Sequence, residues 1–255
     1  MSSIKTYIVG KTLSREALLF ELNNCKLVNE VVGLDTETEG INPVKEASAC
    51  GKGRIVCWSV STPKYQKVFL WADQLEYFTP WLQSEAPKVG HNIYSFDYHM
   101  FARMGIELNG IAADTKRLSR LLYSCKTRSH GLKDLARNWL GIEQPAYTSL
   151  FTRPKHTIEF VQEKVSKKGV VQHLDERTSR RKVGEHKGVP TLLVTGERGR
   201  FGKALELIPL SRIPTDYPDR LEALYEYASL DAQLTRLLYH ALKKELEKVD
   251  WKVAK

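Results

Sequence analysis

The sequence predicts an α/β domain in which a mixed β-sheet is flanked by helices. Three observations lead to this class. Five candidate strands lie early in the chain, helical patterns separate and follow them, and the longest helical pattern comes last. The chain has 255 residues, of which 42% are hydrophobic. This is enough for one domain with a substantial core, and two small domains are the alternative.

The strand candidates are short runs rich in β-branched and aromatic residues. The first five are Lys5–Val9, Val31–Glu37, Arg54–Ser61, Lys67–Trp71 and Lys88–His91, and a further short one is Leu108–Ile111. The stretch between Gly40 and Gly53 is expected to be a connecting loop. Later in the chain, Thr191–Thr195 and Ala204–Ile208 flank a glycine-containing turn and resemble a long hairpin.

Helices are predicted where apolar residues recur at helical spacing. These segments are Ser14–Leu22, Asp73–Ser84, Ser95–Met104, Thr115–Ser124, a segment that reaches Leu140, and a final helix from about Asp219 to Val249. Asp114 is a good N-cap for the helix that starts at Thr115. Ser129 is the expected cap of the helix that reaches Leu140.

The charge of the chain is +9 and is unevenly distributed. Residues 151–203 hold 13 lysines and arginines against 6 acids, so one segment carries most of the excess. This balance suits a polyanionic partner. Within the segment we expect Arg180, Arg181 and Lys182 to contact nucleic-acid phosphates. A solvated loop without a partner is the alternative.

Membrane and disulfide chemistry are not expected. No apolar run approaches the roughly 20 residues of a membrane span, and the N-terminus lacks the features of a signal peptide. The cysteines form no C-x-x-C pair, so we expect free thiols in a reducing compartment; they are Cys25, Cys50, Cys57 and Cys125. A cytoplasmic or nucleoid-associated location follows (the host cytoplasm for a viral source), with an organelle as the alternative.

Three short motifs contain acids at positions where they could act together. Asp35 and Glu37 end a predicted strand, where residues two apart project from the same face. Asp97 lies in the first turn of a predicted helix. Tyr227 and Asp231 are four residues apart and share one helix face. Taken singly, each has a plain structural reading: a solvated strand end, an acid near a helix N-terminus, and a surface pair.

Asp35 and Glu37 also indicate a metal. Two carboxylates side by side repel each other unless a cation lies between them. Clusters of carboxylate oxygens suit Mg²⁺ or Mn²⁺.

In this order, the three motifs resemble the D-x-E, N-x(2–3)-[FY]-D and Y-x-x-x-D motifs of the DnaQ-like, or DEDD, nucleases. A tyrosine in the third motif is typical of the DEDDy branch. Further segments are similar to the proofreading domains of family A DNA polymerases, of the phage and organellar type; they are residues 33–38, 105–108, 114–115 and 132–140. The resemblance covers about residues 31–244, apart from about 145–213.

The resemblance implies an RNase H-like (DnaQ-like exonuclease) fold. It implies a single exonuclease domain over residues 1–255, with a basic insertion at 145–213 between the second and third motifs. Two Mg²⁺ ions about 4 Å apart, replaceable by Mn²⁺, would be held by four acids, and a tyrosine would orient the attacking water. These residues are Asp35, Glu37, Asp97, Asp231 and Tyr227.

The implied reaction is 3′→5′ hydrolysis of DNA to 5′-mononucleotides, in proofreading or DNA processing. The substrate would be a single-stranded or frayed 3′ end, and a separate polymerase chain is a candidate partner. The resemblance also implies substrate contacts by Thr36, Thr38, Ile41 and Asn92. An RNA exonuclease of the RNase D type is the alternative. A non-catalytic nucleic-acid-binding module is disfavoured, because all five catalytic side chains are present.

Overall fold

The computed structural model describes residues 4–39, 53–123, 129–154, 163–165, 171–173 and 205–249. The chain divides into two compact units. The first comprises Met1–Ala146 and Pro209–Lys255, and the second comprises Tyr147–Ile208. All three motifs found in the sequence belong to the first unit. No helix in the described ranges is both long enough and apolar enough to cross a membrane.

The first unit is built on a six-stranded mixed sheet with strand order β1-β4-β3-β2-β5-β6. Its strands are β1 (Thr6–Ile8), β2 (Val32–Glu39), β3 (Arg54–Ser61), β4 (Lys67–Trp71), β5 (Lys88–Gly90) and β6 (Ile111–Asp114). Strand β3 runs antiparallel to both of its neighbours, and the other pairs are parallel. The predicted mixed sheet is therefore confirmed.

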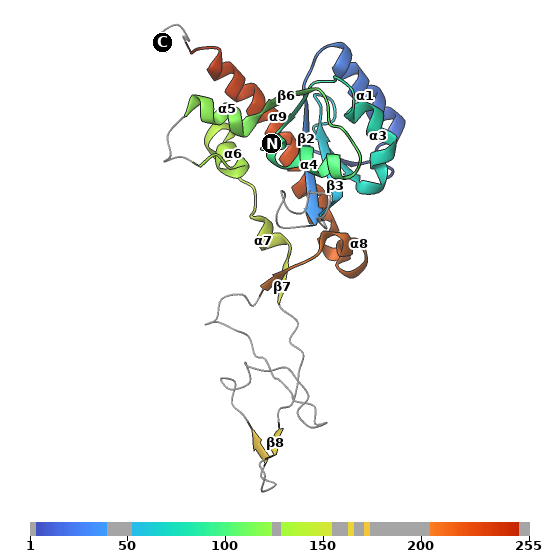
Figure 1. Cartoon of the computed structure of the whole chain (residues 1–255), viewed down its shortest axis with the longest axis vertical. Coiled ribbons are helices and arrows are strands. Elements are labelled where there is room, and N and C mark those ends of the chain that lie inside the picture. The colour runs from blue at the N-terminus through green and yellow to red at the C-terminus, as the bar shows by residue number, and fades with distance from the viewer. Residues whose placement is uncertain are drawn as a thin grey trace. The chain divides into compact units, whose positions relative to one another are not determined.

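Helices cover both faces of this sheet (Figure 1). The α-helices are α1 (Arg15–Leu27), α3 (Leu75–Leu82), α4 (Asp97–Arg103), α5 (Thr115–Leu122), α6 (Leu132–Leu140), α8 (Ile213–Asp216) and α9 (Leu221–Leu246). Short 3-10 turns are η1 (Ala72–Gln74), η2 (Ile93–Ser95), η3 (Leu210–Arg212) and η4 (Pro218–Arg220). Helices α1 and α3 lie on one side of the sheet, and α9 packs along β2, β3 and β4 on the other. Helices α5 and α6 contact α9.

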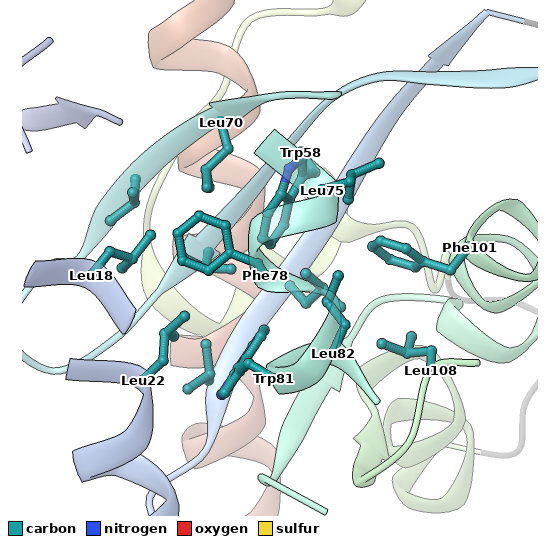
Figure 2. Packing of buried hydrophobic residues seen from close by; sticks show 14 of the residues in the cluster. Leu18, Leu22, Trp58, Leu70, Leu75, Phe78, Trp81, Leu82, Phe101 and Leu108 are labelled. Carbon is teal, nitrogen blue, oxygen red and sulfur yellow. The ribbon is translucent and has the colours of Figure 1, made fainter. Parts of the chain in front are cut away.

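The main hydrophobic core lies between the sheet and the α1–α3 layer (Figure 2). Leu18 and Leu22 of α1 are fully buried there. The rings of Trp58 on β3 and Phe78 on α3 meet edge to face, with centroids 5.6 Å apart. Each large apolar side chain buried in this way contributes about 1.5–3 kcal/mol. This core fixes the sheet as the rigid platform from which the acids project.

One predicted strand is misplaced by three residues. Leu108 belongs to the hydrophobic core but not to a strand, and β6 begins only at Ile111. The reason is Gly110, whose φ is +69° and where a Cβ would lie 2.3 Å from the carbonyl oxygen of Ala86. The chain therefore turns sharply at Gly110, and the strand can form only after that turn.

Two predicted helices also differ at their starts. Helix α6 is preceded by Gly131 as N-cap, and Ser129 instead accepts a hydrogen bond from the Gly131 amide (3.3 Å). The segment expected to be one helix from Ser95 is split into η2 and α4. Phe96, with φ −133° and ψ −78°, separates them and packs against the core.

The second unit contains short elements. They are α7 (Tyr147–Leu150), β7 (Thr152–Pro154), β8 (Glu163–Val165), β9 (Val171–His173) and β10 (Leu205–Leu207). Strand β10 pairs antiparallel with β7, and β8 pairs antiparallel with β9. The strand predicted at Ala204–Ile208 is confirmed as β10, which pairs with β7. Thr191–Thr195, the partner expected from the sequence, lies outside the described residues.

Candidate active site

Strand β2 presents Asp35 and Glu37 toward α9. These residues pair with Ser59 and Cys57 of β3, and the register then shifts, so that Thr38 pairs with Ile55. Such bulges increase local twist and re-aim side chains at the end of a strand. The hydroxyl of Ser59 donates to the Ala228 carbonyl of α9 (2.7 Å), which shows that α9 covers this face.

Gly33 allows α9 to approach β2 closely. A Cβ at Gly33 would lie 2.3 Å from the carbonyl oxygen of Ala232 and 2.9 Å from Cβ of Arg236. Only a glycine fits at this distance. Gly33 is two residues before Asp35, and Ala232 directly follows Asp231. The close approach therefore brings the acids of the first and third motifs together.

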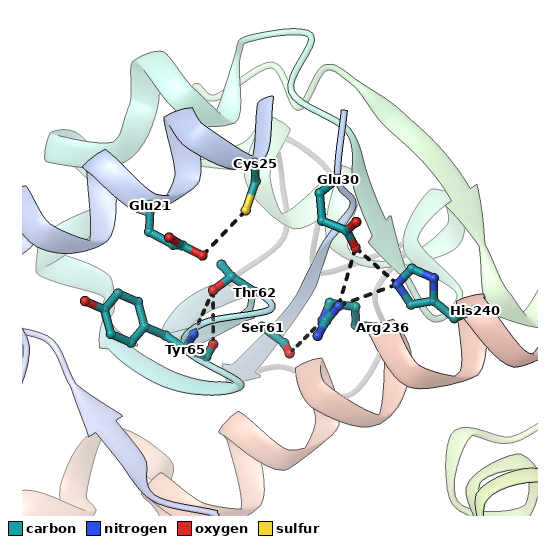
Figure 3. A network of polar contacts seen from close by, with 8 residues as sticks. All are labelled: Glu21, Cys25, Glu30, Ser61, Thr62, Tyr65, Arg236 and His240. Carbon is teal, nitrogen blue, oxygen red and sulfur yellow. Dashed lines mark hydrogen bonds and ion pairs between the residues drawn. The ribbon is translucent and has the colours of Figure 1, made fainter. Parts of the chain in front are cut away.

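A polar network holds α9 along the sheet (Figure 3). Arg236 of α9 lies with its Nη1 3.5 Å from Oε1 of Glu30, just before β2, and with its Nε 3.4 Å from the hydroxyl of Ser61 on β3. Nε2 of His240, one turn further along α9, lies 3.3 Å from the same Glu30 oxygen. These contacts help to fix the position of α9 along β2. They therefore help to set where Asp231 lies relative to Asp35 and Glu37.

Asp35, Glu37 and Asp231 form a carboxylate cluster. One carboxylate oxygen from each lies within 4.8 Å of the others. Oδ1 of Asp231 is buried and has no hydrogen-bond partner in the described part of the chain. A buried acceptor without a donor is costly unless a cation binds it. The cluster therefore fits a divalent cation that prefers oxygen ligands, such as Mg²⁺ or Mn²⁺.

Asp97 reaches the same region by a different route. Strand β5 pairs with β2 only at Val32 and Gly33, so the amide of Thr36 lies beyond that ladder. Oδ1 of Asp97 accepts hydrogen bonds from this amide (3.1 Å) and from the Thr36 hydroxyl (2.6 Å). Asp97 is not one of the three acids within 4.8 Å, but its charge acts on both Asp35 and Glu37.

Burial and mutual repulsion make these acids weak. Burial, and then the charges of Asp231 and Asp97, raise the pKa of Asp35 and of Glu37 well above the usual range. Burial raises the pKa of Asp97 to about 7, against the hydrogen bonds from Thr36. Burial raises the pKa of Asp231 to about 6, against side-chain hydrogen bonds from Gln144 and Tyr227. Without a cation, ionising all four acids at once is therefore costly.

A second carboxylate positions the loop that precedes Asp97. Asn92 has φ +64°, in the left-handed region that asparagine tolerates better than most residues. Its amide donates to Oδ1 of Asp114 (2.9 Å). The same oxygen accepts from the amides of Lys116 (2.9 Å) and Arg117 (3.3 Å), so the predicted N-cap of α5 is confirmed. Asp114 thus joins the second motif to the start of α5.

The remaining residues predicted to bind substrate are distributed as follows. The hydroxyl of Thr36 is engaged by Asp97. Thr38 is half-buried and directly follows the register shift. The other four lie outside the described residues: Ile41, Arg180, Arg181 and Lys182.

Two residues near the cluster are not assigned a role by the sequence. Gln144 follows α6 and donates to the Tyr227 carbonyl (3.3 Å); no sequence signal indicates it. Lys133 lies with its Nζ 4.6 Å from the centroid of the Tyr227 ring. A signal for Lys133 exists, because a lysine in the first turn of a helix opposes the helix dipole.

Comparisons with known proteins identify a family and several relatives of this chain. The family model DNA_pol_A_exo1, described as a 3′-5′ exonuclease, matches residues 8–153. DNA polymerase I A, chloroplastic/mitochondrial, of Arabidopsis thaliana is 30% identical over 261 residues, which cover 97% of this chain and 22% of that protein. DNA polymerase I A, chloroplastic, of Oryza sativa subsp. japonica is 28% identical over 265 residues, with the same coverage. The chain thus spans about a fifth of these relatives.

Among solved structures, one described as the apo form of the nuclease is similar to this chain. Its TM-score is 0.51 at 18% sequence identity, covering 97% of this chain and 84% of the other. The likeness is one of fold, in which a mixed six-stranded sheet is flanked by helices.

Proposed function

This chain belongs to the DNA_pol_A_exo1 family of 3′-5′ exonucleases, and we propose that it hydrolyses DNA from single-stranded or frayed 3′ ends, releasing 5′-mononucleotides. One observation carries the proposal: the oxygens of Asp35, Glu37 and Asp231 lie within 4.8 Å of one another on the face between β2 and α9. Three acids placed this close together serve catalysis better than stability, because each raises the cost of ionising the others.

The acids are proposed as metal ligands. Asp35, Glu37 and Asp231, with Asp97 beside them, would hold two Mg²⁺ ions, and Mn²⁺ would substitute for them. When bound, such a pair supplies a water of lowered pKa and stabilises charge on the departing 3′ oxygen. The orphaned Oδ1 of Asp231 supports this assignment. So does the oxygen-only donor set.

The other residues of the site would position the reactants. Tyr227, whose side chain hydrogen-bonds Asp231, would orient the attacking water. A phenol with an ordinary pKa near 10 is a poor base at neutral pH, so its role is hydrogen bonding. Thr36 holds the carboxylate of Asp97 in place. Thr38, Ile41 and Asn92 are proposed to contact the terminal nucleotide.

We also propose the domain plan implied by the sequence. Residues 1–255 would form one exonuclease domain, and the basic insertion at about 145–213 would help to hold the DNA strand through Arg180, Arg181 and Lys182. The relatives are named as DNA polymerases. On that basis we propose a proofreading or DNA-processing role, in which a polymerase chain supplies the 3′ end.

The test uses matched oligonucleotides of DNA and RNA with a 5′ label. Incubation with Mg²⁺ should shorten the DNA stepwise from its 3′ end, and EDTA should stop the reaction. A bulky 3′ group should protect the strand, and a 5′ block should not. A mispaired primer terminus should be removed faster than a paired one, because a frayed end enters the site more readily.

Each alternative has its own signature. Faster shortening of RNA than of DNA would replace the DNA proposal with an RNase D-type activity. Release of oligonucleotides from a circular substrate would indicate an endonuclease. Binding of DNA without hydrolysis under any metal condition would overturn the proposed enzyme and indicate a binding module.

A further inference from the structure

Lys133, in the first turn of α6, lies against the tyrosine of the third motif. Its Nζ is 4.6 Å from the centroid of the Tyr227 ring and donates to the Pro145 carbonyl (2.7 Å). The side chain is half-buried. Two contacts from different segments therefore hold this ammonium group at the edge of the carboxylate cluster.

The position of Lys133 is unfavourable for the helix itself. A cation in the first turn opposes the partial positive charge of the helix N-terminus. Burial also lowers the pKa of Lys133, while the charges of Asp231 and Glu37 act in the opposite direction. The contacts of Lys133 with the Tyr227 ring and the Pro145 carbonyl hold its ammonium group in this position.

Lys133 forms no ion pair with a carboxylate within the described ranges, although the charges of Asp231 and Glu37 reach it. An ammonium group has three N–H donors, and the Pro145 carbonyl takes one of them. At least one donor remains for an anion that enters the site. In an exonuclease, that anion is the phosphodiester.

We propose that Lys133 donates to a non-bridging oxygen of the phosphate under attack and stabilises the charge that develops there. This inference rests on the proposed exonuclease function and adds to it a catalytic residue outside the three motifs. A preorganised donor in a partly buried site acts strongly, because it needs no reorganisation during the reaction. The aromatic ring and the Pro145 carbonyl supply that preorganisation.

The test compares Lys133→Met with Lys133→Arg. Methionine keeps the apolar stem without charge or donor, and arginine keeps both. We expect Lys133→Met to lower the single-turnover rate roughly 100-fold, the usual cost of one lost donor to a reacting oxyanion. Lys133→Arg should recover most of that rate. Equal rates for wild type and Lys133→Met would overturn the proposal.

A matched control is the contact of Lys11 with Tyr225, a second tyrosine of α9. Nζ of Lys11 lies 5.3 Å from the centroid of the Tyr225 ring and donates to the Tyr225 hydroxyl (3.1 Å). That ring packs against Phe69 and Trp71 of β4, away from the motif tyrosine. Lys11→Met therefore removes a similar lysine–tyrosine contact and should leave hydrolysis unchanged. A loss equal to that of Lys133→Met would show a structural effect and overturn the proposal.

Binding measurements separate this inference from the proposed function. Calorimetry in Mg²⁺ with thymidine 5′-monophosphate should show affinity roughly 10- to 100-fold weaker for Lys133→Met, and affinity for thymidine should not change. Without nucleotide, Mg²⁺ should bind Lys133→Met at least as tightly as wild type, because a cation has been removed beside the acids. Weaker Mg²⁺ binding would indicate a distorted site and contradict the proposal. A wild-type protein that never hydrolyses DNA would refute the exonuclease function, whereas the nucleotide-binding comparison would still test Lys133.

Discussion

Asp35 shows what a proposed metal ligand at this site costs in stability. It is half-buried beside Asp231 and Glu37, and the charges of these neighbours make its ionised form costly. Replacing it with the neutral isostere removes that cost. We expect Asp35→Asn to lose activity by on the order of 1000-fold and to unfold at a higher temperature than wild type in EDTA.

The control for this prediction is Asp73→Asn, at an exposed position in η1. It should keep wild-type activity and change the free energy of unfolding by less than about 0.5 kcal/mol. Paired rate and thermal-melting measurements check both variants. EDTA-sensitive hydrolysis by Asp35→Asn at close to the wild-type rate would show that the metal site lies elsewhere.

Tyr227 can be tested by removing one atom. Its side chain is 8% exposed and hydrogen-bonds Asp231. Tyr227→Phe keeps the ring and its contact with Lys133 but loses the hydroxyl. The single-turnover rate should fall roughly 10- to 1000-fold, the range for one positioning group, and DNA affinity should change little. An unchanged rate would assign Tyr227 a structural role only.

At the scale of elements, the approach of α9 to β2 decides whether the first and third motifs meet. The atom nearest to a Cβ at Gly33 is a backbone oxygen, so no rotamer change can relieve the clash. Gly33→Ala should push α9 outward, costing about 1–3 kcal/mol of stability. A shift of about 1 Å in Asp231 would lower the rate roughly 100-fold.

Gly131→Ala is the matched control for Gly33→Ala. A Cβ at Gly131 meets only the Ser129 hydroxyl at 3.5 Å and a carboxylate oxygen of Asp134 at 3.8 Å, which are ordinary contacts. The single-turnover rate should therefore be close to wild type, and the free energy of unfolding should fall only by the cost of alanine at a helix N-cap, about 1 kcal/mol or less. A Gly33→Ala variant as active and stable as Gly131→Ala would show that α9 is free to adjust, and the close approach would not be what assembles the site.

At the scale of the whole molecule, the acids couple folding to pH and to metal. The folded-state pKa of Asp97 is about 7 and that of Asp231 about 6, both above the ordinary value of 3.8. An acid whose pKa is higher in the folded than in the unfolded state stabilises the fold at pH values below its unfolded-state pKa. That stability is lost as the pH rises through the folded value. Metal-free protein should therefore lose this contribution between about pH 4 and pH 7.

His91 contributes with the opposite sign. Burial lowers its pKa to about 4, so its contribution is present above about pH 6.5 and is lost as the pH falls toward 4. The difference between unfolding curves in Mg²⁺ and in EDTA isolates the cluster. Mg²⁺ at about 100 times its Kd should add about 2.7 kcal/mol near pH 8 and much less near pH 5, because protonated acids do not bind metal. An equal gain at both pH values would contradict metal binding by these acids.

The basic segment is predicted to bind DNA through its positive charge. Arg180, Arg181 and Lys182 belong to residues 151–203, which carry most of the excess positive charge. Changing all three to alanine should weaken DNA binding and reduce the salt slope by about 0.7 log units per lost contact on single strands. The turnover of bound substrate should stay near wild type. Affinities measured against salt concentration that coincide for both proteins would show that these residues do not bind DNA.

Local pattern determined most of the elements and the identity of the acids. β-Branched and aromatic composition predicted β3 and β4 to the residue, N-cap chemistry predicted Asp114 as the cap of α5, and strand geometry predicted the shared face of Asp35 and Glu37. These features depend on neighbours within a few residues, whose side-chain directions follow from strand or helix geometry. The order of the three motifs predicted the family in the same way.

Contacts between distant segments were decided only by the tertiary structure. The start of β6 depends on Gly110 packing against the Ala86 carbonyl. The meeting of Asp35 with Asp231 depends on the missing Cβ of Gly33. Likewise, Asp97 reaches Thr36 because β5 stops short, and Lys133 meets Tyr227 because α6 packs against α9. Periodicity cannot predict such pairs, because the free energy that selects them comes from packing across the whole sheet.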